Sequence, residues 1–64
     1  MSEIIQTRLN ESKGKVITIF LNNNFRYTGK CLNCDDKFLE ILDYKTDKIM
    51  IIDISEIKMV EVGQ

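Results

Sequence analysis

The chain has no proline, no histidine and no tryptophan, and it has two cysteines among its 64 residues. Structural zinc takes four ligands, and one Cys-x-x-Cys pair without histidine does not supply them. The sequence shows no glycine-rich phosphate loop and no nucleophile beside a base, so no catalytic constellation can be identified. We therefore expect no enzymatic activity, no cofactor and no metal site.

Long hydrophobic runs are also missing. The longest apolar run, Ile49 to Ile52, is far shorter than the roughly 20 residues of a membrane-spanning helix. Ile4 and Ile5 are followed at once by Gln6, so residues 4–6 do not resemble the apolar core of a signal peptide. These features predict a cytoplasmic protein that has no membrane partner.

An excess of positive charge is missing as well. Nine basic and ten acidic residues give a net charge of −1. Proteins that bind nucleic acid through many phosphate contacts usually present a basic face. The basic residues gather in the first two-thirds of the chain, at Lys13, Lys15, Arg26, Lys30 and Lys37. A local basic patch is thus possible, while a basic field over the whole protein is excluded.

The length of the chain limits its core. Sixty-four residues form one domain, 1–64, and a domain of this size buries only about 60% of the surface that its unfolded chain exposes. Small domains are commonly stabilised further by disulfides, metals or partner subunits. The composition makes a disulfide or a metal site improbable. We therefore expect the chain to be stabilised by oligomerisation.

Residues 2–12 have the pattern of a short amphipathic helix. Ser2 is a suitable N-cap, and Ile5, Leu9 and Ser12 fall on one face. Gly14 is a suitable C-terminal stop. Because so short a helix is marginal alone, we expect its apolar stripe to pack on the rest of the protein.

From residue 16 the hydrophobic period changes to two, which predicts strands. The run Asn22 to Asn24 suits a hairpin turn because asparagine tolerates positive φ. Gly29, in the middle of the next strand, indicates a bend or a close backbone approach. The predicted strands span 16–21, 25–34, 38–43, 49–53 and 58–62. The fold class is mainly β, a short N-terminal helix followed by a strongly bent, five-stranded antiparallel barrel.

The fourth predicted strand is apolar on both faces. Met50 and Ile52 point to one side, and Ile49 and Ile51 to the other. Such a strand must be covered on both sides, one by the barrel interior and the other by the helix or a second chain.

The two cysteines, Cys31 and Cys34, lie three apart. On a regular strand they face opposite sides and cannot chelate one ion together. We interpret both as small buried hydrophobic residues.

Two stretches resemble the motifs of the Sm-like family, which includes the Sm, LSm and bacterial Hfq proteins. Residues 17–31, with the pattern Ile-x-Ile-x-Leu-x-Asn-Asn, then Tyr-x-Gly-x-Cys, followed by an aspartate at 35 or 36, resemble the first motif. Residues 52–57 occupy the place of the second. Asn24 stands where the family favours glycine, and Cys31 where a larger aliphatic residue is usual. The resemblance covers about residues 2–62.

This resemblance implies an SH3-like barrel of the Sm type that forms a cyclic homo-oligomer, a hexamer or heptamer. In the family the fourth strand of one protomer pairs with the fifth strand of the next. The implied subunit-interface residues are Ile49, Ile51, Met59 and Val60.

The family also binds uridine-rich single-stranded RNA around the central pore, through a stacking side chain and a polar neighbour. If Asp36 is the family aspartate, Phe38 and Glu40 take these two places. If it is Asp35, which the spacing from Gly29 favours, Lys37 and Leu39 take them. Both alignments remain open, and under either one the base-reading asparagine is missing.

Asp53 is the main departure from the family pattern. The arginine-glycine of the Sm second motif aligns with Asp53-Ile54, and the Tyr-Lys-His of Hfq with residues 53–55. A carboxylate therefore replaces a cation near the expected phosphate path. The candidate RNA-binding residues are Lys37, Phe38 and Asp53. The resemblance predicts an RNA chaperone or RNA-processing role, and the alternative is a ring that binds other proteins as a scaffold without uridine binding.

Overall fold

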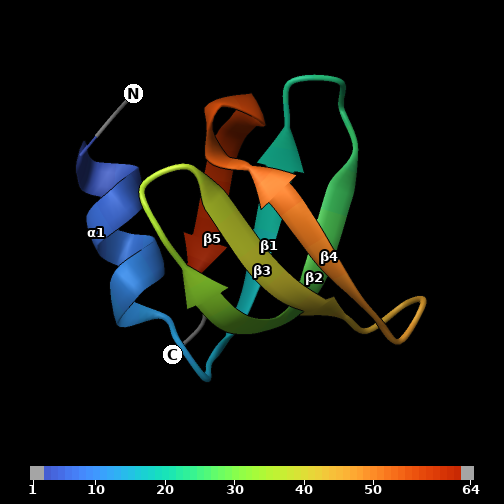
Figure 1. Ribbon diagram of the computed structural model, residues 1–64. Helices are drawn as coiled ribbons and strands as arrows, with labels where there is room; N and C mark the ends of the chain where they lie inside the picture. The colour runs from blue at the N-terminus through green and yellow to red at the C-terminus, as the bar shows by residue number, and fades with distance from the viewer. Residues whose placement is uncertain (1–2, 63–64) are drawn as a thin grey trace.

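The computed structural model describes residues 3–62 as one helix followed by five strands (Figure 1). The elements are α1 (Glu3–Glu11), β1 (Val16–Leu21), β2 (Arg26–Cys34), β3 (Phe38–Asp43), β4 (Lys48–Asp53), the 3-10 helix η1 (Ile54–Glu56) and β5 (Ile57–Val62). The predicted fold class, a short helix and then five antiparallel strands, is confirmed. The predicted cap at Ser2 lies outside the described residues. Within them, no helix is long and apolar enough to cross a membrane.

The strands form one antiparallel sheet in the order β4-β3-β2-β1-β5. Figure 1 shows this sheet curling around the core, with α1 lying to one side. Since β4 pairs with β3 and β5 pairs with β1, these two strands are the edges of the sheet. The barrel is therefore open between β4 and β5 within the described chain.

The core consists of inward-facing aliphatic side chains, which alternate with exposed or half-buried ones along β1 and β3. The helix contributes Leu9, which is fully buried. The buried hydrophobic residues are Leu9, Ile17, Ile19, Leu21, Cys31, Cys34, Leu39, Ile41, Ile52, Ile54 and Ile57. This single cluster joins the helix to every strand of the sheet.

The turn and the bend that the sequence predicts both occur. Asn24 has a φ of 71° and closes the β1–β2 hairpin, as expected for the asparagine run. Gly29 lies against β3 so closely that an added Cβ would be 1.9 Å from the carbonyl oxygen of Leu42. A side chain at position 29 would force β2 and β3 apart, so glycine is required there.

The cysteines differ from their predicted arrangement. The β2–β3 register shifts between Cys31 and Asn33, so Cys31 and Cys34 both face the core. The expectation that they face opposite sides was wrong because it assumed a regular strand. Both thiols are free, and burial raises the pKa of each. They pack as small hydrophobic residues beneath α1, as the interpretation of the sequence proposed.

Helix α1 packs on β2 and leaves the outer face of β4 uncovered. The Gln6 side chain donates a hydrogen bond to the carbonyl of Asp35 at 2.8 Å, and the thiol of Cys31 lies 3.8 Å from the carbonyl of Leu9. Ile49 and Ile51 remain 57% and 69% exposed. The alternative in which the helix covers this face is therefore wrong.

The close approach at Gly29 yields a prediction about stability. Gly29→Ala is expected to lower the free energy of unfolding by about 1–3 kcal/mol, because the new methyl group meets backbone rather than a movable side chain. Urea unfolding at one fixed protein concentration measures the change.

Gly14→Ala is the matched control for Gly29→Ala. Gly14 has open space around it and a φ of +82°, so alanine there should cost only the left-handed backbone strain of about 1 kcal/mol. Equal losses for the two variants would contradict the steric explanation.

Candidate functional site

Both edges of the sheet carry exposed apolar side chains. Ile49 and Ile51 point outward from β4, and Met59 and Val62 are 50% and 40% exposed on β5. Val60, also predicted at the subunit interface, is half-buried against the core. Val62 was not among the predicted interface residues, although it continues the apolar pattern of its strand. Each edge therefore exposes apolar side chains beside backbone groups that have no neighbouring strand in the described chain, and β5 also exposes the charged Lys58 and Glu61.

The turn between β2 and β3 is organised by the Asp35 carboxylate. Its Oδ1 accepts hydrogen bonds from the backbone N–H groups of Lys37 at 2.8 Å and Phe38 at 2.7 Å. The backbone N–H of Asp35 donates to the carbonyl of Phe38 at 3.0 Å. Asp35 therefore holds the tight turn from which Phe38 begins β3.

Each of the two alignments left open by the sequence matches one part of this turn. Asp35 makes the hydrogen bonds of the turn, but Leu39, which that alignment places in the pocket, is fully buried in the core. Phe38 and Glu40 instead face outward, and Phe38 is 46% exposed. The outward-facing pair, Phe38 and Glu40, is the one that the Asp36 alignment names, whereas the carboxylate that holds the turn is the one that the Asp35 alignment names.

The structure brings Lys37, Phe38 and Asp53 together. Phe38 is directly opposite Asp53 in the β3–β4 pairing, and the N–H of Ile54 donates to the carbonyl of Lys37 at 2.9 Å. We call these three residues, with Asp35 and Glu40, the Phe38 surface. It combines one exposed aromatic ring and one cation with three carboxylates.

Two of these carboxylates are held in their ionised form. The Asp53 carboxylate caps η1 by accepting from the N–H and the hydroxyl of Ser55 at 2.9 and 2.8 Å, and these bonds lower the pKa of Asp53. The N–H groups of Phe38 and Lys37 similarly lower the pKa of Asp35. The Phe38 surface is therefore negatively charged at neutral pH.

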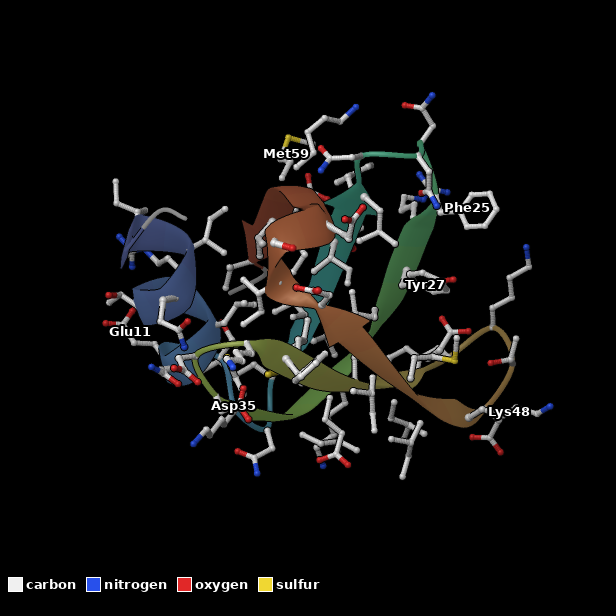
Figure 2. All side chains as sticks on the ribbon, turned by 45° about the horizontal axis from the view of Figure 1, so that its top comes forward. Glu11, Phe25, Tyr27, Asp35, Lys48 and Met59 are labelled. Carbon is white, nitrogen blue, oxygen red and sulfur yellow. The ribbon has the colours of Figure 1, made fainter. Side chains whose placement is uncertain are left out.

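A second surface lies at the other end of β2. A groove of about 740 Å³ opens between the start of β2 and the β3–β4 turn. Phe25 and Tyr44 in its lining are 59% and 53% exposed, and Tyr27 is half-buried. Figure 2 shows Phe25 and Tyr27 projecting from the same side of β2. We call this the aromatic groove; its lining residues are Asn24, Phe25, Arg26, Tyr27, Thr28, Asp43, Tyr44, Lys45 and Thr46.

The charges around the aromatic groove are positive. Arg26 and Lys45 are exposed, whereas the Asp43 side chain is buried and accepts from the N–H and hydroxyl of Thr46 at 3.1 and 2.8 Å. Sequence reasoning missed this groove because its walls come from segments that are far apart in the chain.

The fold is that of a known protein. The chain is similar to the structure described as "1.55 A Crystal structure of the pleiotropic translational regulator, Hfq", with a TM-score of 0.81 and 21% sequence identity over 92% of this chain and 98% of that one. No protein-family model matches the chain, and no curated protein matches it by sequence. The resemblance to the Sm-like proteins is thus confirmed at the level of the fold.

The two turn carboxylates predict how stability depends on pH. Their folded pKa values lie below the ordinary value of 3.8, so the stability they contribute is present above that value. It is lost as the pH falls through the lower folded values. We expect the urea midpoint of the wild type to fall more between pH 7 and pH 3 than that of the double variant D35A/D53A.

Asp36→Ala is the control for this measurement, since the Asp36 side chain makes no hydrogen bond in the described part of the chain. This variant should keep the pH dependence of the wild type. A D35A/D53A variant that also kept it would show that the two caps do not stabilise the fold.

Proposed function

We propose that the chain assembles through β4 and β5 into a closed cyclic homo-oligomer, a hexamer or heptamer, that binds single-stranded RNA. The observation that carries the assembly is the pair of open edges with exposed Ile49, Ile51 and Met59. Pairing β4 of one protomer with β5 of the next satisfies the backbone groups of both edges and buries these side chains. Such a head-to-tail contact forms a ring when its rotation closes.

The small core supports assembly as well. Eleven buried hydrophobic residues form the whole buried cluster of the described chain, and four large aliphatic side chains remain exposed on the two edge strands. Burying a Leu, Ile or Val side chain contributes about 1.5–3 kcal/mol. An interface that repeats around a ring therefore adds substantially to the stability of each protomer.

RNA binding is supported by the exposed Phe38 ring and the adjacent Lys37. Stacking of a base on an aromatic side chain contributes about 1–3 kcal/mol and tolerates different bases. In a ring these two residues repeat once per protomer, which suits a strand that passes from one protomer to the next. Asp53 limits phosphate contacts here, so we expect base stacking to dominate. The role would be that of an RNA chaperone or an RNA-processing factor.

The charge of the Phe38 surface favours a second candidate, a ring that serves as a protein-binding scaffold and does not bind uridine. The carboxylates of Asp35 and Asp53 are ionised, and Glu40 lies on the same outward face. Repeated around a ring, these charges repel phosphate. In this second candidate the ring still assembles through β4 and β5, but its ligand is another protein and not RNA.

The assembly predicts a clear effect of charge on β4. Ile51→Asp should dissociate the ring, because a carboxylate cannot be buried unpaired between two strands. Light scattering should then give the mass of one chain, 7.5 kDa, in place of a hexamer or heptamer. Ile4→Asp, the same substitution at an exposed position of α1, should leave the mass unchanged. A wild-type protein that is monomeric would refute the ring.

If the chain binds RNA at the Phe38 surface, its affinity for RNA should depend on Phe38 and not on Phe25. Phe38→Ala should weaken binding of a short oligouridine by about 5- to 100-fold, the equivalent of one lost stacking contact. Lys37→Ala should weaken it less and should reduce its salt dependence. Phe25→Ala, the same change in the aromatic groove, is the control. Fluorescence anisotropy measures all four proteins, and a wild-type ring that does not bind oligouridine favours the scaffold.

A further inference from the structure

We propose that the aromatic groove binds an extended acidic segment of a partner protein, which adds to the free edge of β2 as a short extra strand. This inference goes beyond ring assembly and RNA binding and depends on neither. It rests on three features of the groove: an unpaired stretch of backbone, exposed aromatic side chains and a positive rim.

The unpaired backbone is at Arg26. In the β1–β2 ladder the N–H of Leu21 donates to the carbonyl of Phe25, and the N–H of Cys31 donates to the carbonyl of Lys15. Leu21–Phe25 and Lys15–Cys31 are therefore hydrogen-bonded pairs. Hydrogen-bonded pairs alternate with non-hydrogen-bonded ones, so the pair Phe20–Arg26 is of the second kind. The N–H and C=O of Arg26 therefore point away from β1, toward the groove.

On that side β3 does not reach Arg26. The β2–β3 pairing begins at Gly29 and Asp43, and its last bond is from the N–H of Tyr44 to the carbonyl of Thr28 at 3.0 Å. Beyond it the chain turns away toward β4. Within residues 3–62 the backbone of Arg26 has no partner on the groove side. The N–H and C=O of Arg26 can therefore exchange two hydrogen bonds with the C=O and N–H of one facing residue in an extended peptide.

The walls of the groove suit apolar side chains of such a peptide. Phe25 and Tyr44 are more than half exposed, although aromatic side chains usually bury a large surface. The volume of about 740 Å³ lies within the range of about 300–1,000 Å³ that is usual for ligand sites. Alternate side chains of an added strand point to the same side, so one or two of them can enter the groove.

The charge of the rim selects an acidic partner. Arg26 and Lys45 are exposed in the lining, and Thr46 donates two hydrogen bonds to the Asp43 carboxylate. A carboxylate on the peptide next to its hydrogen-bonded residue can pair with Arg26. RNA would also find aromatic rings here, but two cations offer few phosphate contacts, and the free backbone edge fits a peptide better.

The groove is separate from the surfaces used above. It lies at the start of β2 and the end of β3, whereas Phe38 lies at the start of β3 beyond the end of β2. Neither Ile49, Ile51 nor Met59 lines it. A protein segment can therefore dock on each protomer while the two edges of the sheet are engaged.

The experiment begins with selection of peptides from a random dodecapeptide phage library on the intact protein. We expect enrichment of sequences with Asp or Glu beside an apolar or aromatic residue, and synthetic versions should protect the Arg26 amide from hydrogen exchange. Tyr44→Ala should weaken their binding at least ten-fold, with Tyr44→Phe retaining most of it and Phe38→Ala retaining all. A mass in light scattering and a urea midpoint equal to those of the wild type confirm that each variant is folded.

Two substitutions at one position test the added strand itself. Arg26→Ala removes the charge and should weaken binding several-fold. Arg26→Pro removes the charge and also the N–H, which the β1–β2 ladder does not use, so it should weaken binding about ten-fold more. Equal effects of the two would overturn strand addition. Selected peptides that are not acidic, no selected peptides at all, or protection of Arg26 by oligouridine or oligoadenosine instead would overturn the proposal.

Discussion

The close approach of β2 and β3 at Gly29 determines most of this small structure. Without a side chain there, the two backbones can cross at the distance that the Leu42 carbonyl imposes, and the sheet can bend around a thin core. The β2–β3 ladder ends close by, at Asp43 and Tyr44, where the Asp43 carboxylate holds the next turn, so the start of β2 extends beyond its neighbour. The bend that surrounds the core and the open edge beside the aromatic groove therefore lie next to each other on β2.

A sheet bent in this way does not close on itself with five short strands. The described β4 and β5 have six residues each, and they end as separate edges. The exposed side chains of β4 include Ile49 and Ile51, whereas those of β5 include Met59 and Val62 together with the charged Lys58 and Glu61. Charged or bulged edges keep strands apart from other chains, but on β4 the exposed residues between Lys48 and Asp53 are Ile49 and Ile51. The edges therefore favour assembly, and a ring is the assembly that leaves no edge open.

The fold could be predicted because each element has a local signal. The period-two pattern, the asparagine run and the mid-strand glycine predict strands, a hairpin and a bend, and all three are present. The inward position of Cys34 could not be predicted, because the register shift after Cys31 reflects the packing of β2 on β3 rather than a motif. The aromatic groove could not be predicted for a related reason, because Phe25 and Tyr44 become neighbours only when the sheet bends. The spacing from Gly29 favours Asp35 as the family aspartate, whereas the burial of Leu39 becomes visible only in the folded chain.

The Phe38 surface and the aromatic groove lie at opposite ends of β2 and β3 and carry opposite charges. At one end Asp35 and Asp53 are kept ionised by hydrogen bonds that the turns require, so the acidic character of the Phe38 surface is a consequence of the fold. At the other end the carboxylate of Asp43 is likewise used to hold a turn, but it is buried, and the exposed charges are those of Arg26 and Lys45. A nearly neutral chain can thereby present an acidic and a basic surface on one small barrel. In a ring the two surfaces would repeat with every protomer, so that RNA at the Phe38 surface and a protein segment at the aromatic groove would not compete for one site.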